Sequence, residues 1–184
     1  MVRHTTYTKH DGIVYGITRT FHILCLVFTL FLIWGLSVNM AEGVRLVTMP
    51  HIPVLIVLSL AGTLYRDSWY FNTQDKTVTS IYGFAWICKR ETFSFSEVER
   101  LELTHFVRGS SDKHAKPTKR RLRAMIVLSL RLKDDQVKTI EVIAEKTSGG
   151  RTESSLQAIA AVTGLPMYVD RPRDLDLAVT YKDL

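Results

Sequence analysis

The sequence predicts a membrane hairpin of two α-helices followed by an α+β soluble domain, an antiparallel β-barrel or sandwich with one C-terminal helix. Three observations lead to this fold class. Two long apolar stretches without charged residues lie within residues 1–65, short runs rich in β-branched and aromatic residues follow them, and one amphipathic segment comes last. With 184 residues, the chain has room for one soluble domain and a short anchor.

The apolar stretches cover residues 21–40 and 46–65. About twenty residues at a rise of 1.5 Å each cross a hydrocarbon core of about 30 Å. The alternatives are a signal peptide for the first stretch and a buried core helix for the second. The first stretch is longer than the apolar region of a signal peptide, about 7–15 residues, and no small-residue cleavage pattern follows it. We therefore predict a transmembrane hairpin over 21–65, after an N-terminal segment over 1–20.

Positive charge gathers on the outer flanks of this hairpin. The loop between the stretches has only Arg45 against Glu42, whereas the flanks carry Arg3, Lys9, Arg19, Arg66, Lys76, Lys89 and Arg90. The positive-inside rule then places both termini and the soluble domain in the cytoplasm, with the short loop outside. We expect a multi-pass protein of a bacterial inner (plasma) membrane.

Four polar residues interrupt the first apolar stretch. Because polar side chains inside a bilayer often hydrogen-bond a neighbouring helix, they are candidates for helix contacts. These candidates are His22, Thr29, Ser37 and Asn39.

The predicted soluble domain covers residues 67–170. Ser68–Asn72 and Thr77–Tyr82 are typical of a β-hairpin, and residues 91–96 alternate with period two before a further strand over 97–107. Gly83 permits a bend or bulge between these runs.

The second half of this domain has the clearest strand pattern. Residues 124–133 and 137–144 are expected to pair across the turn Asp134-Asp135-Gln136. An amphipathic helix is predicted over 152–163 and ends at Gly164. The mixed-charge tail over 171–184 is expected to be extended.

Two runs carry a family resemblance. Ile81-Tyr-Gly-Phe-Ala-Trp-Ile-Cys-Lys-Arg-Glu-Thr-Phe-Ser-Phe-Ser-Glu-Val98 and Ala160-Ala-Val-Thr-Gly-Leu-Pro-Met-Tyr-Val169 resemble the bacterial pleckstrin-homology-like domains found behind paired membrane helices. The resemblance covers about residues 50–170 and implies a PH-like domain of a type used for protein contacts. The layout is also similar to that of the photosystem I assembly factor family. That family has Arg-Trp-Gly-Phe where this chain has Ile81-Tyr-Gly-Phe84, so no role in photosystem I is transferred.

No motif in the sequence indicates a catalytic, cofactor-binding or metal-binding site. Cys25 and Cys88 show no CxxC spacing, and the six histidines form no metal-ligand pattern. Nucleophile elbows, phosphate-binding loops and dinucleotide fingerprints are not found in the sequence either. We predict no catalytic, cofactor-binding or metal-binding residues and no enzymatic activity.

The strongest local feature is a basic run over 113–123. It is either a solvated loop or a contact with anionic lipid or an acidic protein surface, because each cation near an anionic membrane contributes about 1 kcal/mol. Nucleic acid is not expected as a partner, since the run lacks interleaved aromatic residues. The six candidate contacts are Lys113, Lys116, Lys119, Arg120, Arg121 and Arg123.

These features together predict a non-catalytic, membrane-anchored binding module. We expect it to be an accessory subunit or assembly factor of a larger integral inner-membrane protein complex. The alternative is a sensor of anionic lipid at the membrane surface, acting through the basic loop over 113–123.

Overall fold

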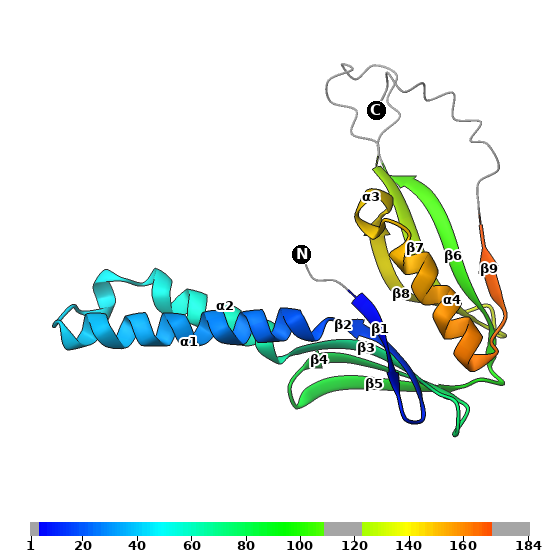
Figure 1. The fold of residues 1–184 in the computed structure, drawn as a ribbon, viewed down its shortest axis with the longest axis horizontal. Helices are drawn as coiled ribbons and strands as arrows, with labels where there is room; N and C mark the ends of the chain where they lie inside the picture. The colour runs from blue at the N-terminus through cyan, green and yellow to red at the C-terminus, as the bar shows by residue number, and fades with distance from the viewer. Residues whose placement is uncertain (1–3, 109–122, 171–184) are drawn as a thin grey trace, which may run out of the picture. The chain divides into compact units, whose positions relative to one another are not determined.

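The computed structural model describes residues 4–108 and 123–170 and contains two sheets and four α-helices in that part of the chain (Figure 1). The first elements are β1 (His4–Lys9), β2 (Gly12–Ile17), α1 (Arg19–Ala41), the 3₁₀ turn η1 (Leu46–Thr48), α2 (His51–Leu64), β3 (Tyr65–Asn72), β4 (Thr77–Phe84) and β5 (Ile87–Ser94). The remaining ones are β6 (Val98–Arg108), β7 (Arg123–Leu132), β8 (Val137–Ala144), α3 (Glu145–Ser148), α4 (Arg151–Thr163) and β9 (Met167–Val169).

The first sheet has the order β1-β2-β3-β4-β5. Its short turns allow only antiparallel pairing between the strands that they join. Strands β1 and β2 lie in the segment 1–20, to which the sequence analysis assigned no element. They are joined by His10 and Asp11, directly before Gly12, and an Asp-Gly pair is a common turn signal in β-hairpins. The helices α1 and α2 are therefore inserted between neighbouring strands of one sheet and do not simply precede the domain.

The second apolar stretch forms a shorter helix than predicted. The prediction was one helix over 46–65, but α2 starts at His51 and has 14 residues, about 21 Å at 1.5 Å per residue. Pro50 is its N-cap, and Pro53 lies in its first turn. Proline lacks the N–H that a helix interior needs, so these two residues restrict the α-helix to the part of the stretch that follows them.

The second sheet has the order β8-β7-β6-β9. The predicted pair over 124–133 and 137–144 is confirmed, with β7 antiparallel to both β6 and β8. The predicted helix over 152–163 is confirmed as α4, which ends before Gly164 at a φ of 70°. Strand β9 was not predicted; it pairs in parallel with β6, Met167 opposite Leu101.

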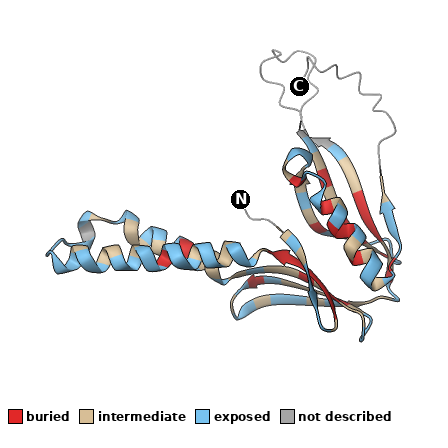
Figure 2. Cartoon of the chain, viewed as in Figure 1, coloured by how far each residue is buried: buried red, intermediate tan, exposed pale blue. Residues whose placement is uncertain are grey.

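The core of the second sheet lies on one face. Side chains on this face of β6 and β7 are fully buried, as are two residues of α4, which packs against β6 (Figure 2). The buried residues are Leu101, Leu103, Leu128, Leu130, Leu156 and Ile159. Antiparallel sheets with a terminal helix are thus confirmed as the coarse fold class of the soluble part.

Candidate membrane interface and ion-pair cluster

Burial in the α1–α2 hairpin is the reverse of that in a soluble domain. Both helices are described throughout, and within them Thr29 is the buried residue of α1 and Ser59 that of α2. Large apolar side chains point outward instead, which Figure 2 shows as the pale blue of the two helices. Those of α1 are Ile23, Leu24, Leu26, Val27, Phe28, Leu30, Phe31, Ile33, Trp34, Val38 and Met40, and those of α2 are Val54, Leu55, Val57, Leu58, Leu60 and Leu64.

Small and polar residues form the seam between the two helices. Thr29 Oγ1 donates a hydrogen bond to Ser59 Oγ at 2.9 Å, and Ser59 Oγ donates to the carbonyl oxygen of Ile56 at 3.1 Å. One turn away, a Cβ added to Gly62 would lie 3.0 Å from Cys25 Sγ, so the backbone of α2 approaches α1 closely here. Small residues that permit close backbone approach are typical of helix interfaces in membranes.

The four predicted helix-contact residues divide into two pairs. Thr29 forms the seam, and His22 Nδ1 lies 3.1 Å from the carbonyl oxygen of Thr63 on α2. Ser37 donates to the Ile33 carbonyl of its own helix, and Asn39 donates to that of Gly35. The structure therefore brings two of the four to the neighbouring helix.

In the part of the chain that the structure describes, α1 is the one helix long and apolar enough to cross a membrane. Its 23 residues extend about 34 Å at 1.5 Å per residue, and only 6% of its most apolar window is buried. The 14-residue α2 is apolar but shorter.

A second exposed apolar surface lies at the turn between β4 and β5. We call Tyr82, Phe84, Trp86 and Ile87 the β4–β5 tip; all four are exposed, Trp86 at 94%. The tip is held beside the end of α2, because Ala85 N donates a 2.8 Å hydrogen bond to the carbonyl oxygen of Leu64.

Two further contacts fix this tip. The ring of Tyr65, directly after α2, packs against Tyr82 and Phe84 with centroids 5.8 and 5.3 Å apart. By contrast, Trp69 and Phe71 are buried in the core. Trp69 and Phe71 of β3 therefore contribute to the core, whereas the exposed aromatic surface comes from the β4–β5 hairpin.

An open recess of about 450 Å³ lies between the tip and the helix ends. The first turn of α1, the last turn of α2, the start of β3 and the β4–β5 turn all contribute to it. Its lining residues are His22, Thr63, Leu64, Arg66, Ala85 and Trp86.

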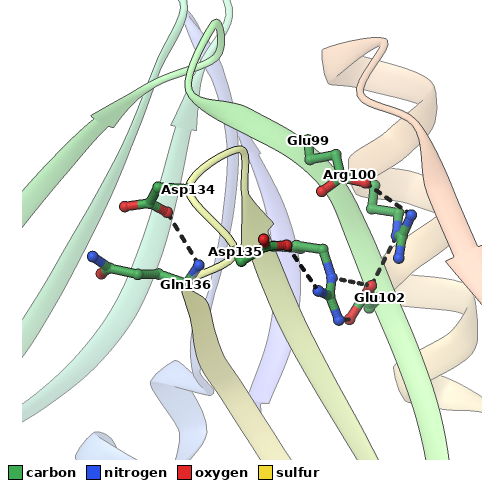
Figure 3. Close-up of polar contacts among 7 residues, drawn as sticks. Glu99, Arg100, Glu102, Asp134, Asp135 and Gln136 are labelled. Atoms are coloured by element: carbon green, nitrogen blue, oxygen red, sulfur yellow. Dashed lines mark hydrogen bonds and ion pairs between the residues drawn. The ribbon is translucent and has the colours of Figure 1, made fainter.

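A separate polar feature is an ion-pair cluster centred on Glu102 of β6 (Figure 3). The Glu102 side chain is 6% exposed and accepts hydrogen bonds from Arg131 Nε at 2.6 Å and Arg100 Nε at 2.8 Å. Arg100 also pairs with Glu99, and its guanidinium lies 5.3 Å from the ring centroid of Tyr168 on β9. The cluster links strands β6, β7 and β9.

Electrostatics in this cluster favour the charged forms. Burial by itself raises the pKa of Glu102, but the hydrogen bonds and charges of Arg131 and Arg100 outweigh it and lower the pKa below its ordinary value. The hydrogen bond to Glu102 raises the pKa of Arg131 in turn. A carboxylate with both oxygens engaged by arginines is a structural link, and it offers no free base for chemistry.

The predicted basic contacts lie almost wholly outside the described residues. Lys113, Lys116, Lys119, Arg120 and Arg121 belong to the undescribed range 109–122. Arg123 is the first residue of β7, and its backbone lies opposite that of Arg108 in β6. The lipid or protein contact of this loop stays a prediction.

Metal-binding clusters of three or more His, Cys, Asp or Glu residues are not found among residues 4–108 and 123–170. Sequence reasoning missed Ser59, Arg66 and Glu102. Ser59 lies four residues before Thr63, the small-xxx-small spacing of membrane-helix interfaces, a signal that was available. Glu102 is one charge in an alternating strand, and nothing local distinguishes it from a solvated residue.

No protein-family model, curated protein or solved structure matches the chain.

Proposed function

We propose that the chain is a non-catalytic, membrane-anchored binding module, an accessory subunit or assembly factor of a larger integral inner-membrane protein complex. The observation that carries the proposal is the reversed burial of the hairpin, where Thr29 and Ser59 lie inside and leucine, isoleucine, valine and phenylalanine side chains lie outside. In water this arrangement leaves a large apolar surface exposed, whereas in a bilayer the same surface meets lipid.

In the proposed topology α1 crosses a bacterial inner membrane and α2 returns along it. The flanking cations favour a cytoplasmic location for both termini and the sheets. The β4–β5 tip then lies at the cytoplasmic headgroup level, where tryptophan and tyrosine side chains are enriched in membrane proteins. The exposure of Trp86 and its place beside the end of α2 support this arrangement.

The PH-like identity of the soluble part is also a proposal. Two sheets followed by one terminal helix, α4, support it, and so does the turn at Ala85 and Trp86, directly after Gly83 and Phe84, within the run that carries the resemblance. Closure of the sheets into a barrel or sandwich belongs to the same proposal.

The second sheet presents an apolar surface to which a partner protein could bind. The register places Phe106, Val142 and Tyr168 on the face opposite the buried leucines Leu101 and Leu103, and all three are exposed. Exposed aromatic and β-branched side chains beside an arginine cluster are the kind of surface found at protein interfaces.

Membrane anchoring is tested by a charge placed on the outer surface of α1. Leu30 is 57% exposed near the middle of this helix. If the surface meets water, Leu30→Arg changes stability by no more than about 0.5 kcal/mol. In a bilayer an arginine at the helix centre costs about 2.5–3.5 kcal/mol, and we expect a loss of the alkali-resistant membrane fraction. Val162→Arg, at an exposed apolar position of α4, is the control and should leave this fraction unchanged.

Partner binding is tested by copurification from mild detergent at native expression, followed by mass spectrometry. The double variant Phe106→Ser and Val142→Ser should remain in the membrane and lose the copurifying integral protein. A monodisperse wild-type monomer without a partner would contradict the accessory-subunit proposal while leaving the membrane anchor intact.

A further inference from the structure

The recess beside the β4–β5 tip combines hydrogen-bond donors with an apolar wall. Arg66 is exposed at its rim, and within the described part of the chain its guanidinium forms no ion pair. Its five N–H donors form a planar fork that matches the oxygens of a phosphate. The neighbouring carboxylate of Asp67 lies 3.3 Å from His4 Nε2.

The other polar lining groups are also suited to an anion. The carbonyl oxygen of Thr63 is an acceptor, so His22 Nδ1 must carry the hydrogen of their 3.1 Å contact. The other ring nitrogen, Nε2, becomes a second donor when the imidazole is protonated. The indole N–H of Trp86 is a donor only. The six lining residues, all of them described, include no carboxylate.

The apolar lining fits the part of a ligand next to its phosphate. Leu64 and Ala85 contribute the apolar wall, and the outward-facing side chains of α2 continue from it. The volume of about 450 Å³ falls within the range of about 300–1,000 Å³ that is typical of small-molecule sites. An inorganic phosphate ion would leave most of this space and all of the apolar wall unused.

We propose that this recess binds the phosphate headgroup of an anionic glycerophospholipid from the cytoplasmic leaflet, with Arg66 as its principal ligand. The inference rests on the proposed membrane anchoring, because the recess lies at the ends of α1 and α2 where lipid phosphates would be. The glycerol and upper acyl chains lie along Leu64, and the tryptophan ring packs at the headgroup level, as interfacial tryptophans do.

The test compares two arginine variants of the full-length chain purified in mild detergent. Arg66 lines the recess, whereas Arg90 is an equally charged, exposed residue of β5 that is not among the lining residues. Native mass spectrometry measures the retention of added phosphatidylglycerol by the wild type, Arg66→Gln and Arg90→Gln. We expect about a tenfold weaker binding of one lipid molecule in Arg66→Gln, because a charge-assisted hydrogen bond is lost, and little change in Arg90→Gln.

Equal losses in the two variants would overturn the site, since they would show diffuse attraction between a basic surface and anionic lipid. Retention of phosphatidylcholine at the same level as phosphatidylglycerol would overturn the preference for an anionic lipid. Competition by millimolar inorganic phosphate as effective as that by lipid would assign the recess to a free ion. Alkaline extraction of the same variants reports anchoring separately, so loss of lipid binding in a protein that stays in the membrane contradicts only this inference.

Discussion

The replacement Glu102→Gln probes the ion-pair cluster that links β6 to β7. It keeps the size of the side chain and removes its charge. In the wild type the carboxylate accepts hydrogen bonds from Arg131 Nε at 2.6 Å and Arg100 Nε at 2.8 Å, and a third contact from Arg131 Nη2 is longer at 3.4 Å. Gln retains one acceptor oxygen, and its amide group places hydrogens against a guanidinium that can only donate.

The magnitude follows from the two short bonds. Hydrogen bonds to a charged group contribute about 1.5–3 kcal/mol and neutral ones about 1 kcal/mol. Both short bonds end on Oε1, so the amide oxygen of Gln can keep them, each with a neutral acceptor, and only the longer contact of Arg131 Nη2 with Oε2 is lost. Breaking a fully buried ion pair costs about 3–5 kcal/mol, but here both arginines reach water and recover part of the loss. We expect the local unfolding free energy of the β6–β7 pair to fall by about 2 kcal/mol.

Hydrogen exchange with mass spectrometry on the full chain in detergent measures this quantity for the amides of β6 and β7. Glu99→Gln is the matched control, because Glu99 pairs with the same Arg100 at 2.9 Å but its side chain is 39% exposed. Exposed pairs contribute at most about 1 kcal/mol, and we expect a change of about 0.5 kcal/mol or less in the control. Equal, small effects of the two replacements would refute the reasoning, since Glu102 would then behave as an ordinary surface charge.

The same residue predicts a pH dependence. The folded pKa of Glu102 lies below its ordinary value of 4.5, because of its hydrogen bonds from the arginines, so the unfolded chain binds the proton more readily than the folded chain does. The stability that Glu102 contributes is therefore present above the unfolded pKa and is lost as the pH falls through the folded pKa. Protection of β6 and β7 should decrease between about pH 5 and pH 3 in the wild type and decrease less in Glu102→Gln.

Three further replacements probe the hairpin and the β4–β5 tip. Gly62→Leu should destabilise the hairpin in detergent by about 1–3 kcal/mol, seen as a lower helix-unfolding midpoint, because even its Cβ meets Cys25 Sγ at 3.0 Å. Gly83→Val should disrupt the tip and raise hydrogen exchange there, since φ is 146° and a Cβ would lie 2.2 Å from the Ile87 carbonyl oxygen; unchanged exchange would contradict this close approach of the two backbones. In a Trp34→Phe background, which removes the exposed tryptophan of α1, Trp86→Phe should remove most of the fluorescence quenching by lipids brominated near the headgroup, and persistent quenching would place the tip away from the interface.

The elements that sequence could predict are those whose burial is set by local alternation. In β7 the residues Ile126, Leu128 and Leu130 are buried, and α4 ends at Gly164 because glycine readily adopts the left-handed conformation there. The alternation of β7 and the helical period of α4 each extend over eight or more residues. Such repetition makes the period readable without any knowledge of the neighbours.

The elements that sequence could not predict depend on distant partners. Strand β9 has three residues and exists through pairing with β6, more than sixty positions away in the chain. Every residue of β2 is buried, and its apolar run Gly12–Ile17 is consistent with a buried strand, but the run alone does not show that its neighbours in the sheet are β1 and, across the helical hairpin, β3. The length of α2 was overestimated because a helix tolerates proline near its start, so Pro50 and Pro53 did not exclude a helix from Leu46, whereas Pro50 is the N-cap.

The candidate site shows the same division. Thr29 was identified because a hydroxyl in an apolar stretch is conspicuous, but its partner Ser59 required the helix register. Arg66 was interpreted as a flanking charge, and only the fold of β4 and β5 brings Ala85 and Trp86 to its side. A local pattern identifies a polar residue in an apolar run, whereas the neighbours of that residue are a property of the fold.

The connectivity of the hairpin explains why a recess exists at this place. Strands β2 and β3 are neighbours in one sheet, and neighbouring strands lie about 4.8 Å apart. Packed helices need about 8–10 Å between their axes. Thr18 is the one residue between β2 and α1, and β3 follows α2 directly, so the chain must diverge within the first turn of α1 and the last turn of α2. Contacts such as that of His22 with the carbonyl oxygen of Thr63 hold the two helices together beyond this point. The β4–β5 turn borders the space between the helix ends through the hydrogen bond from Ala85 N to the carbonyl oxygen of Leu64. The space that results is a consequence of inserting a helical hairpin into a sheet, and in the proposed topology its position at the helix ends would bring lipid phosphates within reach.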